Sequence, residues 1–454
     1  MPASLTAAEQ FLIELINRAR LAPDAEAARY GIDLNEGLSP LTLESGSRQV
    51  LAPNAALNAA SAAHSAWMLR SDTFSHTGSG GSSHSQRFED AGYGSWWRTG
   101  ENIAWRGSTG SIDGNDAIAL NHQQLFLSAG HRKNLLGDSF REIGVGHEMG
   151  SFTTSSGGTY NASMLTEGFA LGGSEVFVTG VVYRDRDGDG FYSIGEGTGG
   201  ITASTRYKDS AGASRSDTDR GGAHDHGGYV LELASPDGMV TATLGDGTVT
   251  ATARLDLSDG NVKLDLVNGT LLKSSGNTRL VSGVTKAELL GVEDLTLAGN
   301  AKGNMLRGNS GDNRLDGGKG NDKLLGLGGA DKLNGGKWSD KLFGGNGQDT
   351  LIGGRGKDRL IGGGGNDALK GGGGADTFVF KGRFGTDTIR DFGPGDKVLL
   401  GGPGEAGTVN AFRNALSQEG RDLVYDRHDD GANVIVFRDT TLKQLTLADD
   451  IDFV

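Results

Sequence analysis

Cysteine is absent from this sequence of 454 residues, and proline occurs only 7 times. Without cysteine the chain can form neither disulfide bonds nor thiolate metal sites. So few prolines beside 78 glycines also exclude a collagen-like protein, because collagen needs both residues in strict triplets. No run of about 18 apolar residues occurs, so we expect no membrane-spanning helix. The N-terminus lacks a basic segment followed by an apolar run, and no ordinary signal peptide is therefore recognisable.

Positive charge is also scarce. The sequence has 57 acidic residues against 43 Lys and Arg, which gives a formal net charge of −14. Such a chain repels nucleic acid and anionic membranes unless cations intervene, so we expect neither as a partner. Acidity alone indicates only solubility, whereas carboxylates at fixed spacing indicate binding of divalent cations. The length predicts two to four domains.

Five regions of different composition follow one another. Residues 1–170 carry most of the histidines and a helical periodicity, and residues 174–267 alternate apolar and polar positions as β-strands do. Short strands in residues 268–298 lead into a nine-residue repeat at residues 299–380. The repeat fades in residues 381–454. We therefore predict a multidomain protein in which a mixed helix and sheet domain precedes an all-β domain and a repeat domain.

The repeat starts at Gly299 and runs for nine units without a slip. Glycine occupies the first position of every unit, a carboxylate or amide the sixth, and Leu or Phe the eighth. A flexible linker has no reason to keep such a register. The pattern is a known signature of a calcium-binding parallel β-roll, in which glycines permit the turns and acidic side chains supply oxygen ligands. The predicted calcium ligands are the sixth-position aspartates, Asp322, Asp331, Asp340, Asp349, Asp358, Asp367 and Asp376.

Calcium is expected to decide whether the repeat folds. Each unit orders nine residues at about 1–2 kcal/mol apiece in backbone entropy, and buries one Leu, which returns roughly 1.5–3 kcal/mol. Hydrogen bonds between turns add about 1 kcal/mol each. The stacked aspartates repel one another until a cation binds. We expect the first two turns to bind calcium poorly, because Asn304 and Asn313 carry no charge. Leu327 and Trp338 also depart from the glycine pattern.

Residues 284–400 resemble the RTX (repeats-in-toxin) family of proteins secreted by Gram-negative bacteria. The resemblance includes the lead-in Gly291–Leu297, the closing segment Gly374–Phe380 and the segment Asp387–Phe392. It implies that the chain leaves the cell unfolded through a type I secretion apparatus and folds outside in calcium. An uncleaved C-terminal signal directs such export, and residues 447–454 have the acidic and then apolar composition of these signals.

A second calcium motif lies in the all-β region. Residues 185–196 match the calcium-loop pattern D-x-D-x-D-G-x5-E in full. Strands are expected on both sides, at residues 176–183 and 201–207, where an EF-hand has helices. The segment Gly180–Gly197 resembles the prealbumin-like B-repeat domains of bacterial surface adhesins, which implies a β-sandwich that serves as a rigid spacer. The predicted ligands are Asp185, Asp187, Asp189, the Phe191 carbonyl, Ser193 and Glu196.

Candidate chemistry lies in the first region, where Thr6 and Glu9 also predict the start of a helix. Several short motifs occur there in order. They include His64-Ser65, Phe74-Ser75-His76, Arg87 with Ala91-Gly92-Tyr93, Gly100-Glu101-Asn102-Ile103-Ala104, Ser128-Ala129-Gly130-His131-Arg132 and Ile143-Gly144-Val145-Gly146. Together they resemble the bacterial branch of the CAP superfamily of cysteine-rich secretory and pathogenesis-related proteins, across residues 7–170. The resemblance implies an α-β-α sandwich with a central cleft.

In that family two histidines and two acidic residues meet in the cleft and can hold a divalent metal such as zinc. The matching residues here are His76, Glu101 and His131, whereas Ser128 replaces the second acidic residue. Two imidazoles and a carboxylate with one open position make a chemically sound zinc site. His64 is expected on a helix beside the cleft, where it could compensate for the missing ligand. The alternative is that these side chains only hydrogen-bond neighbouring loops.

Three functions are compatible with a CAP sandwich, a prealbumin-like sandwich and a parallel β-roll. The first is a secreted, non-catalytic module whose CAP domain binds an extracellular ligand or protein. The second is a zinc-dependent hydrolase in which Glu101 is the general base on a metal-bound water held by His76 and His131. The third is a calcium-stabilised adhesin or matrix component. Because no cysteine nucleophile or G-x-S-x-G turn occurs, and Ser128 leaves the metal tetrad incomplete, we favour the first.

Overall fold

The computed structural model describes residues 5–219, 226–401, 409–426, 433–442, 444–445 and 451–453. Apart from residues 451–453, the predicted secretion signal lies outside the described residues. The chain divides into two compact units, residues 1–251 with 255–269 and residues 252–254 with 270–454. Within the described ranges no helix is both long and apolar enough to cross a membrane.

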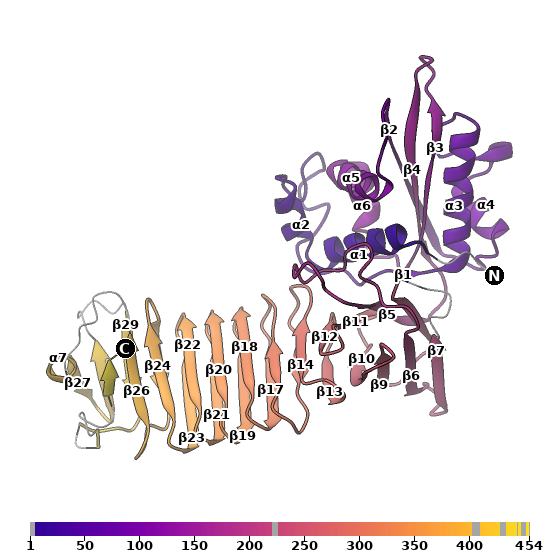
Figure 1. The fold of residues 1–454 in the computed structure, drawn as a ribbon. Helices are drawn as coiled ribbons and strands as arrows, with labels where there is room; N and C mark the ends of the chain where they lie inside the picture. Colours follow the sequence, from indigo (N-terminus) through magenta and orange to yellow (C-terminus); the bar gives the residue numbers. More distant parts are fainter. Residues whose placement is uncertain are drawn as a thin grey trace. The chain divides into compact units, whose positions relative to one another are not determined.

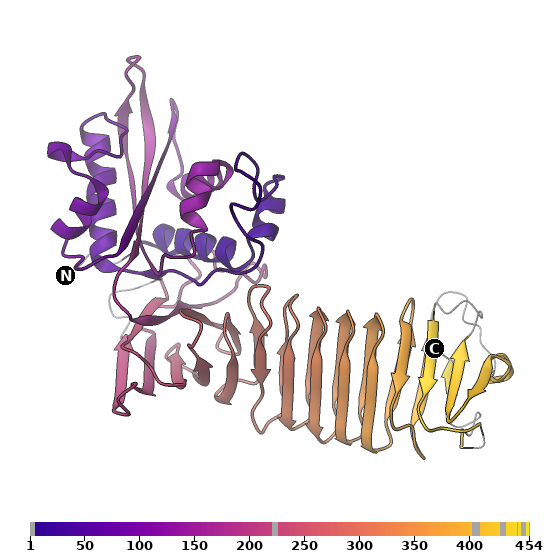
Figure 2. The same ribbon diagram turned by 180° about the vertical axis from the view of Figure 1, so that it is seen from behind.

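The first part of the first unit is a four-stranded sheet with helices on both faces (Figures 1 and 2). The helices are α1 (Ala7–Leu21), α2 (Pro23–Arg29), α3 (Ala55–Arg70), α4 (His84–Asp90), α5 (Gly114–Leu127) and α6 (Ala129–Leu135). The strands are β1 (Ala52–Pro53), β2 (Arg98–Ser108), β3 (Glu142–Thr153) and β4 (Thr159–Leu171). The sheet order is β1-β3-β4-β2, in which only the β1 and β3 pair is parallel. Helices on both faces are what an α-β-α sandwich requires.

Two apolar cores hold these layers together. On one face, α1 begins at the predicted capping box of Thr6 and Glu9 and directs Leu12 and Ile16 into a core with residues of α5, α6 and the sheet. On the other face, α3 packs directly on β3. A Cβ on Gly144 would lie 2.1 Å from the backbone of Leu57, so only glycine permits this approach. The Ile143-Gly144-Val145-Gly146 motif is thus a packing motif.

The rest of the first unit is made of strands. They are β5 (Val176–Tyr183), β6 (Thr202–Lys208), β7 (Ser214–Asp219), β8 (Gly228–Leu233), β9 (Met239–Gly245), β10 (Thr250–Asp256) and β11 (Val262–Val267). Strand β5 pairs with β11 in parallel and with β8 antiparallel, and β6 lies between β7 and β9 in antiparallel pairing. The predicted calcium loop connects β5 to β6, as expected from its flanking strands. The prealbumin-like sandwich stays a prediction.

The second unit contains a β-solenoid of about 7 turns over residues 271–401 (Figure 1). Its strands are β12 (Leu271–Ser274), β13 (Thr278–Ser282), β14 (Lys286–Leu289), β15 (Thr296–Ala298), β16 (Met305–Arg307), β17 (Arg314–Lys319), β18 (Lys323–Gly328), β19 (Lys332–Lys337), β20 (Lys341–Asn346), β21 (Thr350–Gly356), β22 (Arg359–Gly364), β23 (Ala368–Gly374), β24 (Thr377–Lys381), β25 (Gly385–Ile389) and β26 (Lys397–Gly401). Even- and odd-numbered strands form separate parallel sheets.

One coil of the solenoid therefore contains two nonapeptides. Leu324 pairs with Leu342 in one sheet and Leu315 with Leu333 in the other, so hydrogen-bonded partners are 18 residues apart. The eighth-position side chains are at most 1% exposed and fill the interior. The parallel β-roll predicted from the repeat is thus present. The described part of the chain continues with α7 (Val409–Asn414), β27 (Leu416–Glu419), β28 (Asp422–Asp426), β29 (Asn433–Phe437) and β30 (Ile451–Phe453).

Candidate functional site

The sixth-position aspartates form two rows in the roll, because successive nonapeptides alternate between the two sheets. In one row Asp340 Oδ1 accepts the Asp322 backbone N–H at 2.7 Å, and in the other Asp349 Oδ1 accepts the Asp331 N–H at 2.8 Å. The second carboxylate oxygen, Oδ2, is buried without a hydrogen-bond partner in the described residues at seven positions. These are Asp322, Asp331, Asp340, Asp349, Asp358, Asp367 and Asp387.

These unpartnered oxygens lie beside backbone carbonyl oxygens. A Cβ on Gly344 would lie 2.2 Å from Asp349 Oδ2 and 2.5 Å from the Gly362 carbonyl oxygen. Both oxygens therefore line a space that exists only because the first position of the unit is glycine. Carboxylate and carbonyl oxygens are the ligands that Ca²⁺ prefers. The residues present fit a calcium ion by donor type, by the unpartnered buried oxygen and by the space that glycine leaves.

Burial also makes these carboxyl groups resist ionisation while no cation is near. It raises the pKa of Asp322 to about 6 and that of Asp331 to about 7. A buried carboxylate becomes favourable when an opposite charge lies within a few ångströms. A divalent cation between neighbouring coils would supply that charge. The rows thus offer oxygen ligands at a place where a positive charge would stabilise the ionised carboxylates.

The rows end differently at the two ends of the roll. At the start, the Asn313 side-chain amide donates to the Glu293 carbonyl and to Asn309 Oδ1, at 3.3 and 2.9 Å. The amide that stands in place of a carboxylate is thus engaged in hydrogen bonds, and poor calcium binding by the first turns stays a prediction. At the far end, Asp387 Oδ1 accepts the Asp367 N–H at 2.8 Å across a spacing of 20 residues, so the row outlasts the nonapeptides.

Sequence reasoning missed the role of Asp387 and that of Asp396, which continues the other row by accepting the Asp376 N–H at 2.8 Å. A shared signal could have found them. Each precedes an inward apolar residue by two positions, Ile389 and Val398, as every sixth-position Asp precedes its Leu or Phe. The D-x-apolar spacing of the rows therefore continues past the end of the nine-residue period.

The loop at residues 185–196, called the calcium loop from here on, brings its acidic residues together. Ligand atoms of Asp185, Asp187 and Asp189 all lie within 4.8 Å of one another. Glu196, at the last position, is only 5% exposed, and its carboxylate accepts backbone N–H groups of Arg186 and Ser193 at 2.6 and 2.9 Å. The structure thus brings Asp185, Asp187 and Asp189 together, whereas Glu196 lies outside this group and uses both carboxylate oxygens on backbone N–H groups. A role of Glu196 as the closing calcium ligand stays a prediction.

In the first domain, Glu101 on β2 links His76 to Arg87. His76 Nδ1 donates to Glu101 Oε1 at 2.9 Å, and the Arg87 guanidinium donates to Oε2. Burial alone would raise the pKa of Glu101, but the His76 hydrogen bond and the Arg87 charge outweigh it and hold the pKa below its ordinary value. Glu101 is therefore ionised, with both oxygens engaged. The motif pointed to His76 and Glu101, but the role of Arg87 came from the structure.

His131 and His64 have partners of their own. His131 Nδ1 lies 2.8 Å from Ser128 Oγ at the start of α6, and His64 Nε2 donates to the Ser75 carbonyl at 2.9 Å. Burial lowers the pKa of both imidazoles, so both are neutral at neutral pH. Among the residues that the structure describes, only Asp185, Asp187 and Asp189 form a group of three acidic or histidine side chains with ligand atoms within 4.8 Å of one another. His76, Glu101 and His131 do not form such a group, and zinc is not supported.

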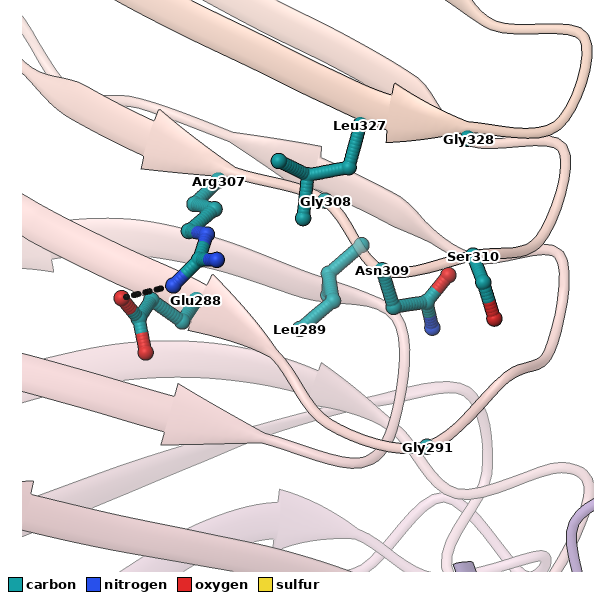
Figure 3. Close-up of a pocket in the computed structure, with 9 residues that line it drawn as sticks. All are labelled: Glu288, Leu289, Gly291, Arg307, Gly308, Asn309, Ser310, Leu327 and Gly328. Carbon is teal, nitrogen blue, oxygen red and sulfur yellow. Dashed lines mark hydrogen bonds and ion pairs between the residues drawn. The ribbon is translucent and has the colours of Figure 1, made fainter. Parts of the chain in front are cut away.

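A pocket of about 430 Å³ lies on the roll (Figure 3). Arg307 on β16 reaches Glu288 on β14 in an ion pair of 3.5 Å at one side of it. Leu327 lines the pocket with a φ of 89°, a left-handed conformation that costs a non-glycine residue roughly 1–2 kcal/mol. The departure from the repeat at this position therefore creates a local surface feature and leaves the roll intact.

Two families match parts of the chain. The cysteine-rich secretory protein (CAP) family matches residues 13–163, and the RTX calcium-binding nonapeptide repeat matches residues 307–342 and 343–378. No curated protein matches. The first match spans His76, Glu101 and His131, and the second spans the roll from β16 to β24.

Three solved structures are similar to parts of the chain. The extracellular lipase LipA from Serratia marcescens has 18% identity and a TM-score of 0.22 over 38% of this chain and 40% of that chain. An extracellular protein with an SCP domain from Bacillus anthracis has 21% identity and a TM-score of 0.22 over 37% and 44%. An outer surface protein from Borrelia burgdorferi has 17% identity and a TM-score of 0.21 over 33% and 90%. The chain spans less than half the length of the first two.

Proposed function

Because the chain contains a CAP domain followed by RTX calcium-binding repeats that form a β-solenoid, we propose that it is a secreted protein whose roll folds only where calcium is abundant. The observation that carries the proposal is the two rows of buried carboxylates with unpartnered oxygens. Folding of these rows without calcium would bury like charges side by side, whereas calcium turns the same groups into ligands. Export through a type I secretion apparatus of a Gram-negative cell belongs to the same proposal.

The proposed calcium ligands are the row aspartates from Asp322 to Asp376, with Asp387 added, and the calcium loop. The proposed domains keep the predicted boundaries, with a CAP domain at residues 1–170 and a prealbumin-like spacer at residues 174–267. The lead-in at residues 268–298, the roll at 299–380 and the C-terminal segment follow.

The CAP domain is proposed to bind an extracellular ligand or protein without catalysing a reaction. The support is the state of Glu101, whose two oxygens are used by His76 and Arg87, and the absence of a metal-ligand group around it in the described residues. A zinc-dependent hydrolase would need Glu101 to exchange one of these partners for a metal or a water. An adhesin or matrix role would use the same calcium-dependent roll and spacer.

One observation keeps a hydrolase as the second candidate. Glu101 orients the His76 imidazole through Nδ1, which leaves Nε2 available as a metal ligand, and the His76 side chain is 55% exposed. Zinc content separates the candidates. We expect the wild type, His76→Ala and His131→Ala to retain the same negligible zinc after purification in added zinc. One zinc ion in the wild type that both variants lose would favour the hydrolase.

Calcium dependence of the roll is tested on the full chain. We expect far-ultraviolet circular dichroism to show little β-structure from the roll in chelator and a gain of β-structure in millimolar calcium. Equilibrium dialysis should then count fewer calcium ions for Asp349→Asn than for the wild type. Asp259→Asn is the control, because Asp259 is an exposed aspartate outside the roll and outside the calcium loop. An unchanged spectrum between the two conditions would rule out a calcium-folded roll.

A further inference from the structure

The calcium loop packs its apolar residues against the CAP domain inside the first compact unit. The Phe191 ring lies edge-on to the Phe11 ring of α1, with centroids 6.2 Å apart. The Arg18 guanidinium lies over the same ring, 4.9 Å from its centroid. Ile194 packs against the apolar core that α1 shares with α5 and the sheet. The loop is thus part of the surface that covers α1.

Phe191 has two roles in this arrangement. It occupies the seventh position of the calcium loop, whose backbone carbonyl is a calcium ligand in loops of this type. Its N–H donates to Asp189 Oδ1 at 2.7 Å, so its backbone is tied to a second proposed ligand. The next residue, Tyr192, is 1% exposed and packs edge-on to Tyr183. Phe191 would therefore bind calcium through its backbone carbonyl, and it contacts the CAP domain through its ring.

Arg18 continues the contact into the CAP domain. Its guanidinium donates to both oxygens of Glu26, at 2.9 and 2.6 Å, and Glu26 lies 3.8 Å from His122 on α5. Burial alone would raise the pKa of Glu26, but the nearby His122 and the Arg18 guanidinium hold it at about 2. Phe191 therefore covers Arg18, whose side chain is 25% exposed, beside the buried Glu26, and its removal would expose this ion pair further to water.

The rest of the junction is fixed by buried polar contacts. Lys263 of β11 forms ion pairs with Glu14 of α1 at 2.7 Å and with Asp265. The Asn261 amide donates to the Val50 and Arg141 carbonyls at 2.9 and 2.8 Å. Breaking such buried contacts leaves charges and polar groups unpaired, which is costly. The two domains are therefore held together independently of the loop, and the loop can change without separating them.

We propose that calcium in this loop stabilises the CAP domain through Phe191, which gives that domain a calcium dependence separate from that of the roll. The inference rests on the proposed calcium loading of the loop. Without a cation the carboxylates of Asp185, Asp187 and Asp189 repel one another within 4.8 Å, and an open loop withdraws Phe191 from Phe11 and Arg18. A bound cation removes the repulsion and fixes the Phe191 backbone.

Tryptophan fluorescence can report on the CAP domain alone. Trp67, Trp96, Trp97 and Trp105 lie in that domain, and the fifth tryptophan, Trp338, lies in the roll. Trp338 has a φ of 77° at a position where the repeat has glycine, so Trp338→Gly suits the backbone. In this background the full chain is unfolded with urea, in chelator and in millimolar calcium, and the fluorescence midpoint is measured.

We expect calcium to raise the midpoint of the parent and of Phe191→Leu, which keeps an apolar side chain on α1. The shift should be lost in the double variant Asp187→Asn/Asp189→Asn and in Phe191→Ala. Comparing shifts, and not absolute midpoints, removes any general destabilisation by Phe191→Ala. Asp340→Asn, which weakens calcium binding by the roll, should keep the full shift.

The number of calcium ions bound, measured by equilibrium dialysis, distinguishes a failure of calcium loading in the loop from a failure of the coupling through Phe191. Equal counts in the parent and the double loop variant would overturn calcium loading of the loop, and the inference with it. A count lower by one in the double variant, together with a parent-like shift in Phe191→Ala, would overturn only the coupling through Phe191. Loss of the shift in Asp340→Asn would assign the effect to the roll and overturn the inference as well.

Discussion

Buried carboxylate oxygens without a hydrogen-bond partner occur in two settings among the described residues. In the roll, an unpartnered oxygen such as Asp349 Oδ2 lies beside a carbonyl oxygen, and a cation completes the site. Glu167 on β4 is also fully buried, but only Asn102 contacts its carboxyl group by a hydrogen bond in the described residues, at 3.0 Å. Burial raises the pKa of Glu167 to about 8. The row aspartates are proposed calcium ligands, whereas Glu167 is a carboxylic acid that burial keeps protonated at neutral pH.

The neutral state of Glu167 predicts a pH dependence of CAP-domain stability. The folded pKa of about 8 lies above the ordinary value of 4.5 for a glutamate, so the folded state holds the proton more tightly. Stability is therefore complete below about pH 4.5, falls by up to about 1.4 kcal/mol per pH unit, and levels off above about pH 8.

Urea unfolding followed by tryptophan fluorescence between pH 5 and 9 measures this slope. We expect Glu167→Gln to flatten it, because the amide keeps the shape and the Asn102 contact without titrating. Glu44→Gln is the control, since Glu44 is exposed in the same domain. Equal slopes in the wild type and Glu167→Gln would show that another group is responsible.

At the scale of elements, the sequence predicted the roll because its signal is periodic. Fixed glycines, aspartates and leucines were enough to infer parallel strands, inward leucines and acidic turns. The period could not show that two nonapeptides make one coil, because consecutive units are alike. It was the pairing of Leu324 with Leu342, 18 residues on, that placed alternate aspartates in separate rows.

Single residues in the CAP domain gave weaker signals. The motifs located His76 and Glu101, yet no pattern indicated that Arg87 would occupy the second Glu101 oxygen. No sequence pattern indicated the roles of Glu167 and Lys263 either. Each is a single charged residue in a strand, where the alternation of apolar and polar positions predicts an exposed side chain. In the structure both strands are buried on both faces at these positions. Tertiary burial, which no local spacing records, decided their roles.

The rows of aspartates allow a prediction about how the roll ends. Asp387 is fully buried with an unpartnered Oδ2, whereas Asp396 uses its two oxygens on the N–H groups of Asp376 and Gly393, both within 3 Å. We expect Asp387→Asn to bind one calcium ion fewer than the wild type. Asp396→Asn should bind the same number, although it loses stability.

Equilibrium dialysis in millimolar calcium gives both counts on the full chain. An equal loss in the two variants would mean that calcium binding at the end of the roll does not depend on the unpartnered oxygen. An unchanged count in Asp387→Asn would place the last calcium site within the nonapeptides.

At the scale of the whole molecule, the two compact units draw stability from different sources. The first unit has apolar cores that combine large side chains such as Phe126 and Phe169 with buried ion pairs. The roll buries little more than one Leu or Phe per nonapeptide beside its carboxylates. Burial of apolar surface does not depend on calcium, whereas stacked carboxylates do. Removal of calcium by a chelator should therefore destabilise the roll much more than the first unit.

Limited proteolysis of the full chain tests this separation. In chelator we expect rapid cleavage beyond residue 269 and survival of a fragment that contains residues 5–269, because the first unit keeps its apolar cores even with an empty calcium loop. In millimolar calcium both units should resist cleavage.

Leu342→Asp is the control for the roll, since a charge in its interior prevents calcium from protecting it, and the fragment should survive unchanged. If the fragment of Leu342→Asp disappears in calcium as fast as its roll, the first unit depends on the roll for folding. If the roll resists cleavage in chelator, calcium is not what folds it.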